Sequence, residues 1–237
     1  GARRETHPQH WQEETDWRLE PAEGDEPGIK AVGRIEGPDE KGADLVVEGP
    51  IEDLVEAVGT SKEPYTASER ARLENHTAIW RVTVEGGRDE GLERAVWTTQ
   101  LMSTFVEAGA AGAFLPAILE LHSPSFVQNQ SMSIGHIQPV VNLFVGAWDD
   151  GDWMATRGLT AFGLPELETP VEGGLNAAYF RLMDIASGMI NNRRPVPAGA
   201  DVEVGPERFV IEEGRQGPED ERVPFSGQYG VLTVRSE

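Results

Sequence analysis

The stretch VVNLFVGAW at residues 140–148, the turn sequence DDGD at 149–152 and the segment WMATRGLTAF at 153–162 decide the fold. The first stretch is almost continuously apolar, which is typical of a strand buried within a sheet. Aspartate and glycine in the second favour a reversal of the chain. We therefore predict a central strand over 140–148 and a partner strand over 153–162, joined by a tight turn.

Helical patterns flank this hairpin on both sides. Apolar residues recur at helical spacing from Leu92 to Val106, where Gly109 stops the pattern, and again from Leu175 to Ile190. The sequence Thr66–Glu69 is a capping box, in which a hydroxyl and a carboxylate satisfy the first backbone N–H groups of a helix. The apolar spacing over 51–58 predicts a further short helix.

Shorter alternating or apolar segments predict further strands. They are 29–35, 44–47, 78–84, 112–116, 202–204, 209–211 and 229–234. The order strand, helix, strand over 78–116 is that of a right-handed crossover unit. As a whole, the pattern predicts an α+β fold, in which a mixed β-sheet carries helices packed mainly on one face.

The first 28 residues differ from the rest of the chain. They are polar and rich in glutamate, yet they contain Trp11 and Trp17, whose indole rings are costly to leave in water. We predict an acidic, tryptophan-containing N-terminal tail over residues 1–28, either docked on the body or free. Residues 29–237 are predicted to form a single α+β domain, with a weak boundary signal near residue 62.

The charge balance excludes several classes of partner. The 237 residues include 41 acidic and 20 basic side chains, so the formal net charge is −21, and there is no cysteine. Nucleic-acid backbones and anionic membranes are bound through clustered lysine and arginine, so we expect neither as a partner. The lack of cysteine excludes disulfides, a thiolate nucleophile and a zinc–thiolate site. We expect a cytoplasmic protein and leave its oligomeric state open.

The common cofactor and metal motifs are incomplete. The segment 107–113 lacks the third glycine of a dinucleotide fingerprint and the lysine of a phosphate-binding loop, and it reads as the end of a helix. The acidic run 149–152 offers oxygen ligands for calcium but lacks the longer pattern of a calcium-binding loop, so a hairpin turn is the simpler interpretation. We therefore predict no cofactor and no metal.

Histidines supply three of the five candidate functional positions. His122 and His136 flank a long polar loop, a type of segment that often carries function, and Ser123 beside them suggests a nucleophile with a histidine base. His76 precedes a predicted strand. The simpler interpretation is that these histidines cap helices or pack in the core, because no oxyanion motif accompanies them.

The other two candidates, Arg157 and Glu166, lie in the segment after the predicted hairpin turn. Glu166 and Glu168, with Arg157 nearby, suggest an acid and a base on either side of a cleft. Carboxylates that alternate along one strand more often form a solvated face. No complete catalytic set follows from these residues.

The segment TRGLTAFGLPELE at residues 156–168 resembles a motif of the bacterial domain of unknown function 4261 (DUF4261) family. The similarity extends over roughly residues 70–195 and includes a histidine before a strand, a long helix and an alanine- and glycine-rich strand. The resemblance implies an α+β domain and no established chemistry. It points to His76, Arg157 and Glu166 as positions to test, while Gly158 and Gly163 suit a bent strand.

Three functional hypotheses remain at this stage. The first is a non-enzymatic protein-binding domain that captures a basic partner, because a strongly negative field accelerates such association. An immunity-type protein that masks a basic toxin and a secretion-system accessory protein are two versions of it. The second is a structural subunit of a larger assembly, with some of the six tryptophans at interfaces. The third is a small hydrolase or transferase that uses a histidine and a carboxylate of the 122–168 region.

Overall fold

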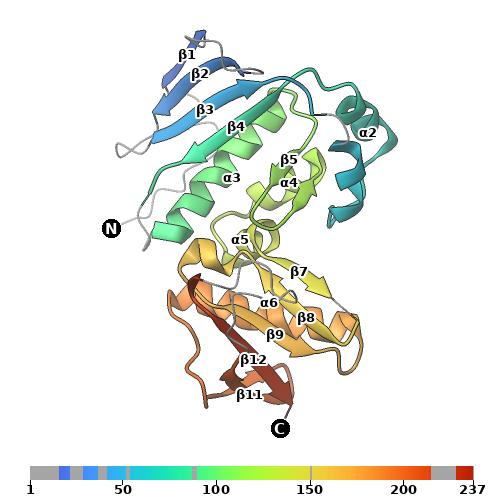
Figure 1. Cartoon of the computed structure of the whole chain (residues 1–237), viewed down its shortest axis with the longest axis vertical. Coiled ribbons are helices and arrows are strands. Elements are labelled where there is room, and N and C mark those ends of the chain that lie inside the picture. Colours follow the sequence, from blue (N-terminus) through green and yellow to red (C-terminus); the bar gives the residue numbers. More distant parts are fainter. Residues whose placement is uncertain are drawn as a thin grey trace.

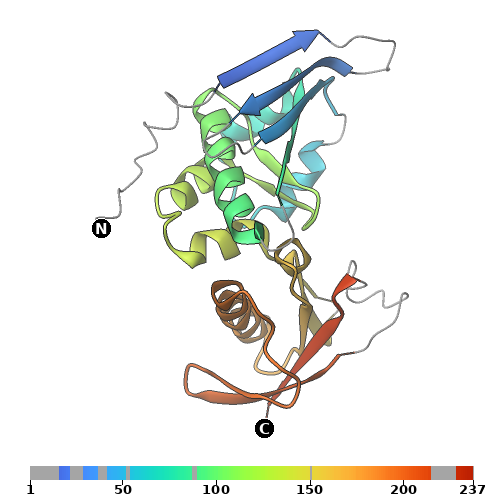
Figure 2. The same ribbon diagram turned by 90° about the vertical axis from the view of Figure 1, so that its left-hand side faces the viewer.

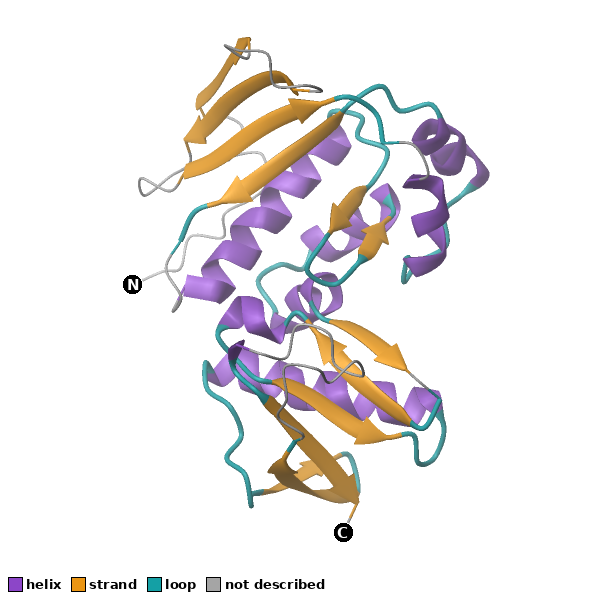
Figure 3. Cartoon of the chain, viewed as in Figure 1, coloured by secondary structure: helices purple, strands orange, loops and turns teal. Residues whose placement is uncertain are grey.

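Two lobes make up the described part of the chain in the computed structural model, which covers residues 16–21, 29–36, 42–51, 54–86, 90–149, 151–214 and 228–236. We call residues 16–144 the N-terminal lobe and residues 146–236 the C-terminal lobe (Figure 1). Each lobe combines helices with its own β-sheet, which confirms the predicted α+β class (Figure 3). The described strands form three sheets, of four, six and two strands, and the six-stranded sheet is the mixed one.

The N-terminal lobe is built on an antiparallel four-stranded sheet backed by one long helix. The sheet has the order β1 (Asp16–Pro21), β2 (Ile29–Glu36), β3 (Gly42–Glu48) and β4 (Ile79–Val84), and the helix is α3 (Gly91–Glu107). Ile35 and Ala43 from the sheet pack on Trp97 and Leu101 of α3, and all four side chains are buried. The amphipathic pattern that predicts α3 is therefore the pattern that covers this sheet.

Strand β1 lies within the predicted tail of residues 1–28. Its backbone pairs with β2, so that Trp17 is in register with Ile35. Part of the predicted tail thus belongs to the sheet, whereas Trp11 lies outside the described residues.

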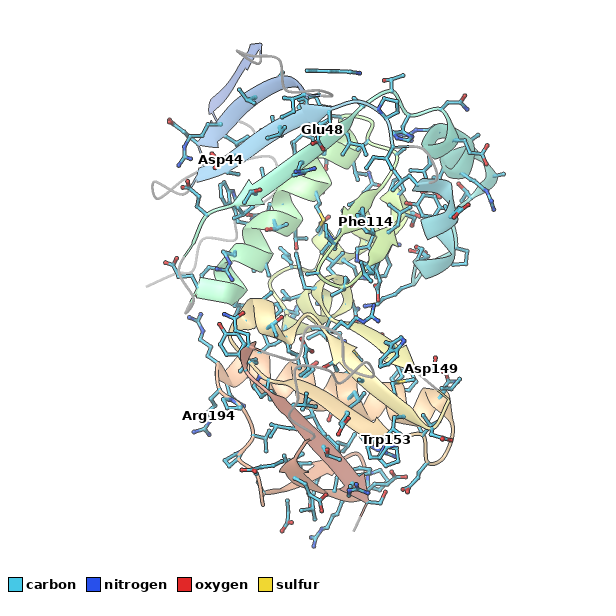
Figure 4. The ribbon with its side chains drawn as sticks, in the orientation of Figure 1. Asp44, Glu48, Phe114, Asp149, Trp153 and Arg194 are labelled. Carbon is cyan, nitrogen blue, oxygen red and sulfur yellow. The ribbon has the colours of Figure 1, made fainter. Side chains whose placement is uncertain are left out.

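The outer face of the four-stranded sheet carries paired charges. Arg34 binds Asp44 at 3.0 Å and Glu85 at 2.6 Å, and Arg81 binds Glu48 at 2.9 Å. Asp44 and Glu48 are labelled on β3 in Figure 4. Such exposed pairs add little to stability and leave this face solvated.

The remaining elements of the N-terminal lobe are short. They are η3 (Leu54–Thr60), α2 (Ala67–Glu74), β5 (Ala113–Leu115), β6 (Glu120–His122), α4 (Pro124–Ser131) and α5 (Ile137–Phe144). The capping box at the start of α2 is confirmed, because Thr66 Oγ1 accepts from Glu69 N at 3.2 Å and Glu69 Oε2 accepts from Thr66 N at 2.9 Å. The predicted crossover unit was wrong, since β4 and β5 lie in different sheets and β5 pairs with β6 as a hairpin.

The apolar run over 140–148 is divided between a helix and a strand, so the predicted central strand was wrong. Its first half is the end of α5, where Val140, Val141 and Leu143 are buried. Pro139 lies in the first turn of this helix, where a missing N–H costs no hydrogen bond. The second half is β7 (Gly146–Asp149), which lies at the edge of its sheet and not at the centre.

The C-terminal lobe is a mixed six-stranded sheet covered on one face by a helix (Figure 2). After β7 its elements are β8 (Trp153–Arg157), η5 (Leu159–Phe162), β9 (Glu166–Pro170), α6 (Leu175–Asn192), β10 (Asp201–Val204), β11 (Glu207–Glu213) and β12 (Val231–Ser236). The spatial order is β10-β11-β12-β9-β8-β7, and only β9 and β12 run parallel. β7 and β8 pair antiparallel, so the chain reverses between Asp149 and Trp153 as predicted, but the partner strand ends at Arg157 and not at Phe162.

The two lobes meet where glycines let the backbones approach. The loop between β5 and β6 places Ile118, which is buried, over Gly146 and Gly158. A Cβ atom added at Gly158 would lie 2.0 Å from the Phe144 carbonyl oxygen and 2.8 Å from Ile118 Cγ2. This junction positions the charged residues described next. Among the described residues, none of the helices has the length and apolar character needed to span a membrane.

Candidate functional site

A half-buried lysine connects segments at the junction between the lobes. Lys62 follows η3, and its Nζ donates to the carbonyl oxygens of Asn142 and Val145, each at 2.7 Å. These carbonyls belong to the end of α5 and the residue after it, where a cation complements the helix dipole. Lys62 Nζ also lies 3.4 Å from Glu120 Oε2, and burial lowers the pKa of Lys62 while Glu120 opposes that shift.

Glu120 is the acidic partner of Lys62 and begins β6. Its side chain packs against Gly146, because a Cβ atom there would lie 2.8 Å from Glu120 Oε1. Burial raises the pKa of Glu120 to about 7, although the charges of Lys62 and Arg157 act in the opposite direction. A carboxyl group with such a pKa is partly protonated near neutral pH, as in many general acids and bases.

Arg157 approaches the same cluster from the end of β8. Its guanidinium lies 5.5 Å from the ring centroid of Trp148, within the range of a cation–π contact. Burial lowers the pKa of Arg157, while the charges of Glu120 and Glu166 raise it. The Arg157 side chain forms no hydrogen bond or ion pair with the residues that the structure describes, and its Nε atom is buried.

His122 lies two residues after Glu120 and is fully buried. Its Nε2 atom lies 2.9 Å from the Leu143 carbonyl oxygen, so Nε2 carries the proton and donates it. Burial lowers the pKa of His122 to about 4, which keeps the ring neutral at physiological pH. Ser123 is no nucleophile for this histidine, because its Oγ accepts from Phe126 N at 3.1 Å and caps α4.

Glu166 has a structural role in the turn between β8 and β9. Its carboxylate is fully buried and accepts hydrogen bonds from Thr156 Oγ1 at 2.6 Å, Gly158 N at 2.9 Å and Thr160 N at 3.2 Å. Burial raises the pKa of Glu166, and these donors oppose the shift. These hydrogen bonds form one network within the 156–168 segment. Through it, the Glu166 carboxylate stabilises the turn that contains η5.

The other candidates lie apart from this cluster. His76 Nδ1 donates to the Leu73 carbonyl oxygen at 2.7 Å, and His76 Nε2 accepts from Ile51 N at 3.1 Å, which fixes the ring as a structural link. His136 is exposed at the start of α5, and its side chain makes no capping hydrogen bond. The structure brings together only Arg157 and Glu166 of the five predicted positions.

Lys62 and Glu120 are absent from the predicted candidates. Lysine is rare in this chain, with three residues in total, and Glu120 alternates with His122 in a short apolar segment. Neither the rarity of lysine nor the position of Glu120 predicts a pair. The approach of Lys62 to Glu120 depends on contacts between segments that are far apart in the sequence.

Glu120 and His122 have opposite effects on stability as the pH changes. The folded-state pKa of Glu120 lies above its ordinary value of 4.5. The contribution of Glu120 to the free energy of unfolding is therefore lost as the pH rises from about 4.5 through about 7. The folded-state pKa of His122 lies below its ordinary value of 6.5. The contribution of His122 to the free energy of unfolding is therefore lost as the pH falls from about 6.5 to about 4. Each shift corresponds to about 3 kcal/mol, so the two slopes offset each other between these limits.

Replacing Glu120 by glutamine should leave the pH dependence of stability that His122 causes without the opposing one. We expect the free energy of unfolding of Glu120→Gln, relative to wild type, to rise by about 2 kcal/mol between about pH 5 and about pH 7. Urea unfolding at a series of pH values measures this difference, and Glu107→Gln is the control because Glu107 is exposed and distant from the cluster. A difference that is independent of pH would contradict the raised pKa of Glu120.

Neither a metal-binding group nor a comparison with known proteins indicates what the site does. Within the described ranges, no group of three or more histidine, aspartate or glutamate side chains is arranged to hold a metal ion. No family model matches the chain, and neither the curated proteins nor the solved structures contain a match. The resemblance over residues 70–195 to the family of unknown function therefore stays a prediction.

Proposed function

We propose that this chain is a non-enzymatic binding protein that captures a partner with a basic surface. The observation that carries the proposal is the distribution of charge, because most described basic side chains are occupied by ion pairs within the chain. The arginines in such pairs are Arg34, Arg70, Arg81, Arg193, Arg208 and Arg235. The surplus of acidic groups thus remains at the surface.

Exposed acidic side chains without a partner occur on several elements. Those that form no ion pair with any described residue include Glu56, Glu107, Asp184, Asp201, Glu207 and Glu213. Surface charge of one sign accelerates association with a partner of the opposite sign and favours it over others. The immunity-type and secretion-system versions of this proposal differ in the partner, so the identity of the partner distinguishes them.

The enzymatic alternative is favoured by Glu120 alone. Its raised pKa suits acid–base catalysis, but the side chain is 8% exposed and faces Lys62, so a substrate does not reach it in this conformation. Ser123 and His122, which would complete a hydrolase, are occupied in capping and packing, and the exposed His136 lies apart from Glu120. The structural-subunit alternative predicts a stable oligomer in solution.

The protein, immobilised as bait in a lysate of its own organism, should retain a basic protein that increasing salt releases. We expect the affinity of the purified partner to fall at least tenfold between about 50 mM and about 300 mM NaCl, because salt screens attraction between exposed charges. Calorimetry of the purified pair measures this dependence. An affinity that does not change with salt, or the absence of a basic partner, would overturn the proposal.

A further inference from the structure

A groove runs between the C-terminal half of α6 and the outer edge of β10, with a volume of about 470 Å³. Ile185, Met189, Val196 and Val202 provide apolar walls. Asp184 and Glu203 are its acidic lining residues, and Glu203 Oε1 lies 3.2 Å from Arg208 Nε in an exposed ion pair. Gly188 adds no side chain to the helix wall. The groove is therefore lined by both apolar and acidic residues.

The sheet edge beside the groove is open for further pairing. β10 is the first strand of the six-stranded sheet and pairs only with β11. Among the described residues, no backbone hydrogen bond reaches residues 201–204 from the opposite side. An edge of this type can add another strand through its free N–H and C=O groups.

The side chains of β10 specify what such a strand should contain. Asp201 and Glu203 are exposed, whereas Val202 and Val204 are half-buried on the side of α6. Directly opposed side chains on paired strands contact each other, so alternate residues of an added strand would meet carboxylates and the apolar groove. Arg194, the one cation of the lining, extends outward beyond the end of α6 (Figure 4).

We infer that this groove is the docking site for an extended segment of the basic partner, in which arginine or lysine alternates with small apolar residues. The inference rests on the proposed function and adds the place of binding. The basic side chains pair with Asp201 and, by sharing it with Arg208, with Glu203, while the apolar ones fill the space between β10 and α6. A second copy of this chain does not suit the edge, because antiparallel pairing of two β10 strands opposes like charges.

The probe is a fluorescent peptide of about seven residues in which valine and arginine alternate, and fluorescence anisotropy measures its binding to the full chain. Gly188→Leu fills the groove without strain, because a Cβ atom at this helical position meets open space. Asp201→Asn with Glu203→Gln removes the charges. We expect each change to weaken binding at least tenfold, whereas Glu56→Gln with Glu107→Gln, a matched charge control, changes it less than about twofold. A peptide with proline at its central valine, which cannot complete the strand pairing, should also bind at least tenfold more weakly.

The outcomes separate this inference from the proposed function. If the peptide binds and the groove variants bind as tightly as wild type, the docking site is wrong while capture of a basic partner stands. If neither the peptide nor any basic protein binds wild type, both fail. Sedimentation of the free chain as a dimer that Gly188→Leu dissociates would identify the occupant as a second copy and overturn the assignment.

Discussion

Gly158→Ala is expected to lower the free energy of unfolding by about 3–5 kcal/mol. Gly158 has a φ of 112°, in the left-handed region that other residues rarely adopt. The new methyl group would also lie 2.0 Å from the carbonyl oxygen of Phe144. That oxygen belongs to the end of α5, where Val145 N still bonds back to the Val141 carbonyl oxygen, so the backbone cannot move aside without breaking the junction.

Gly109→Ala separates the two causes of this loss. Gly109 has a φ of 106°, but a Cβ atom there has no neighbour within 4 Å. We expect its substitution to cost about 1–2 kcal/mol from backbone strain alone. Urea unfolding of both variants provides the comparison. Equal losses would show that the lobes do not approach closely at Gly158.

Glu166→Ala is expected to cost about 3–5 kcal/mol, because it leaves several buried donors without an acceptor. Thr156 Oγ1 and the N–H groups of Gly158 and Thr160 all point at this carboxylate. Water cannot replace it, since Glu166 has no exposed surface. The same urea measurement applies, with Glu172→Ala as a control at an exposed position.

Two substitutions at Thr156 test the network from the donor side. Its hydroxyl donates to Glu166 and accepts from Leu167 N at 2.8 Å. Thr156→Val should therefore lose about 1–3 kcal/mol, whereas Thr156→Ser keeps both bonds and should lose less. If Glu166→Ala is as stable as wild type, the carboxylate has no structural role and Glu166 returns as a candidate for function.

The long helices could be predicted because their information is local. Leu92–Val106 and Leu175–Ile190 repeat apolar residues at helical spacing over several turns, and the structure places α3 and α6 there. The capping box at Thr66 is also a local signal. In the same way, the turn at 149–152 follows from residues that favour reversal over any regular structure.

The apolar run over 140–148 shows where local information ends. A short apolar stretch suits a buried strand and a buried helix equally well, and Pro139 is compatible with the first turn of a helix. The choice depends on α3 and α6, which pack on either side of α5. Likewise, Phe114 belongs to a small hairpin because Glu120–His122 returns to pair with its strand. The sequence does not indicate this pairing, and the polar segment after His122, predicted as a loop, forms α4.

The candidate site required the tertiary structure. The sequence singles out Arg157 and Glu166, yet it indicates neither that Glu166 is buried nor that Lys62 lies beside Glu120. Both pKa shifts, that of Glu120 upward and that of His122 downward, result from burial at the junction between the lobes. Burial of a polar group depends on which segments surround it, and periodicity within one segment does not contain that information.

The parallel pair β9 and β12 has a consequence for the order of assembly. β12 lies between β9 and β11, although the β10–β11 hairpin precedes it in the chain. Thr169 Oγ1 donates to the Val234 carbonyl oxygen across a separation of 65 residues, so this contact closes a long loop. During synthesis the β10–β11 hairpin cannot be hydrogen-bonded into the sheet of β7–β9 until residues 231–236 have emerged from the ribosome, because β12 lies between them. The C-terminal lobe should therefore fold late and slowly, since pairing between distant segments limits the rate.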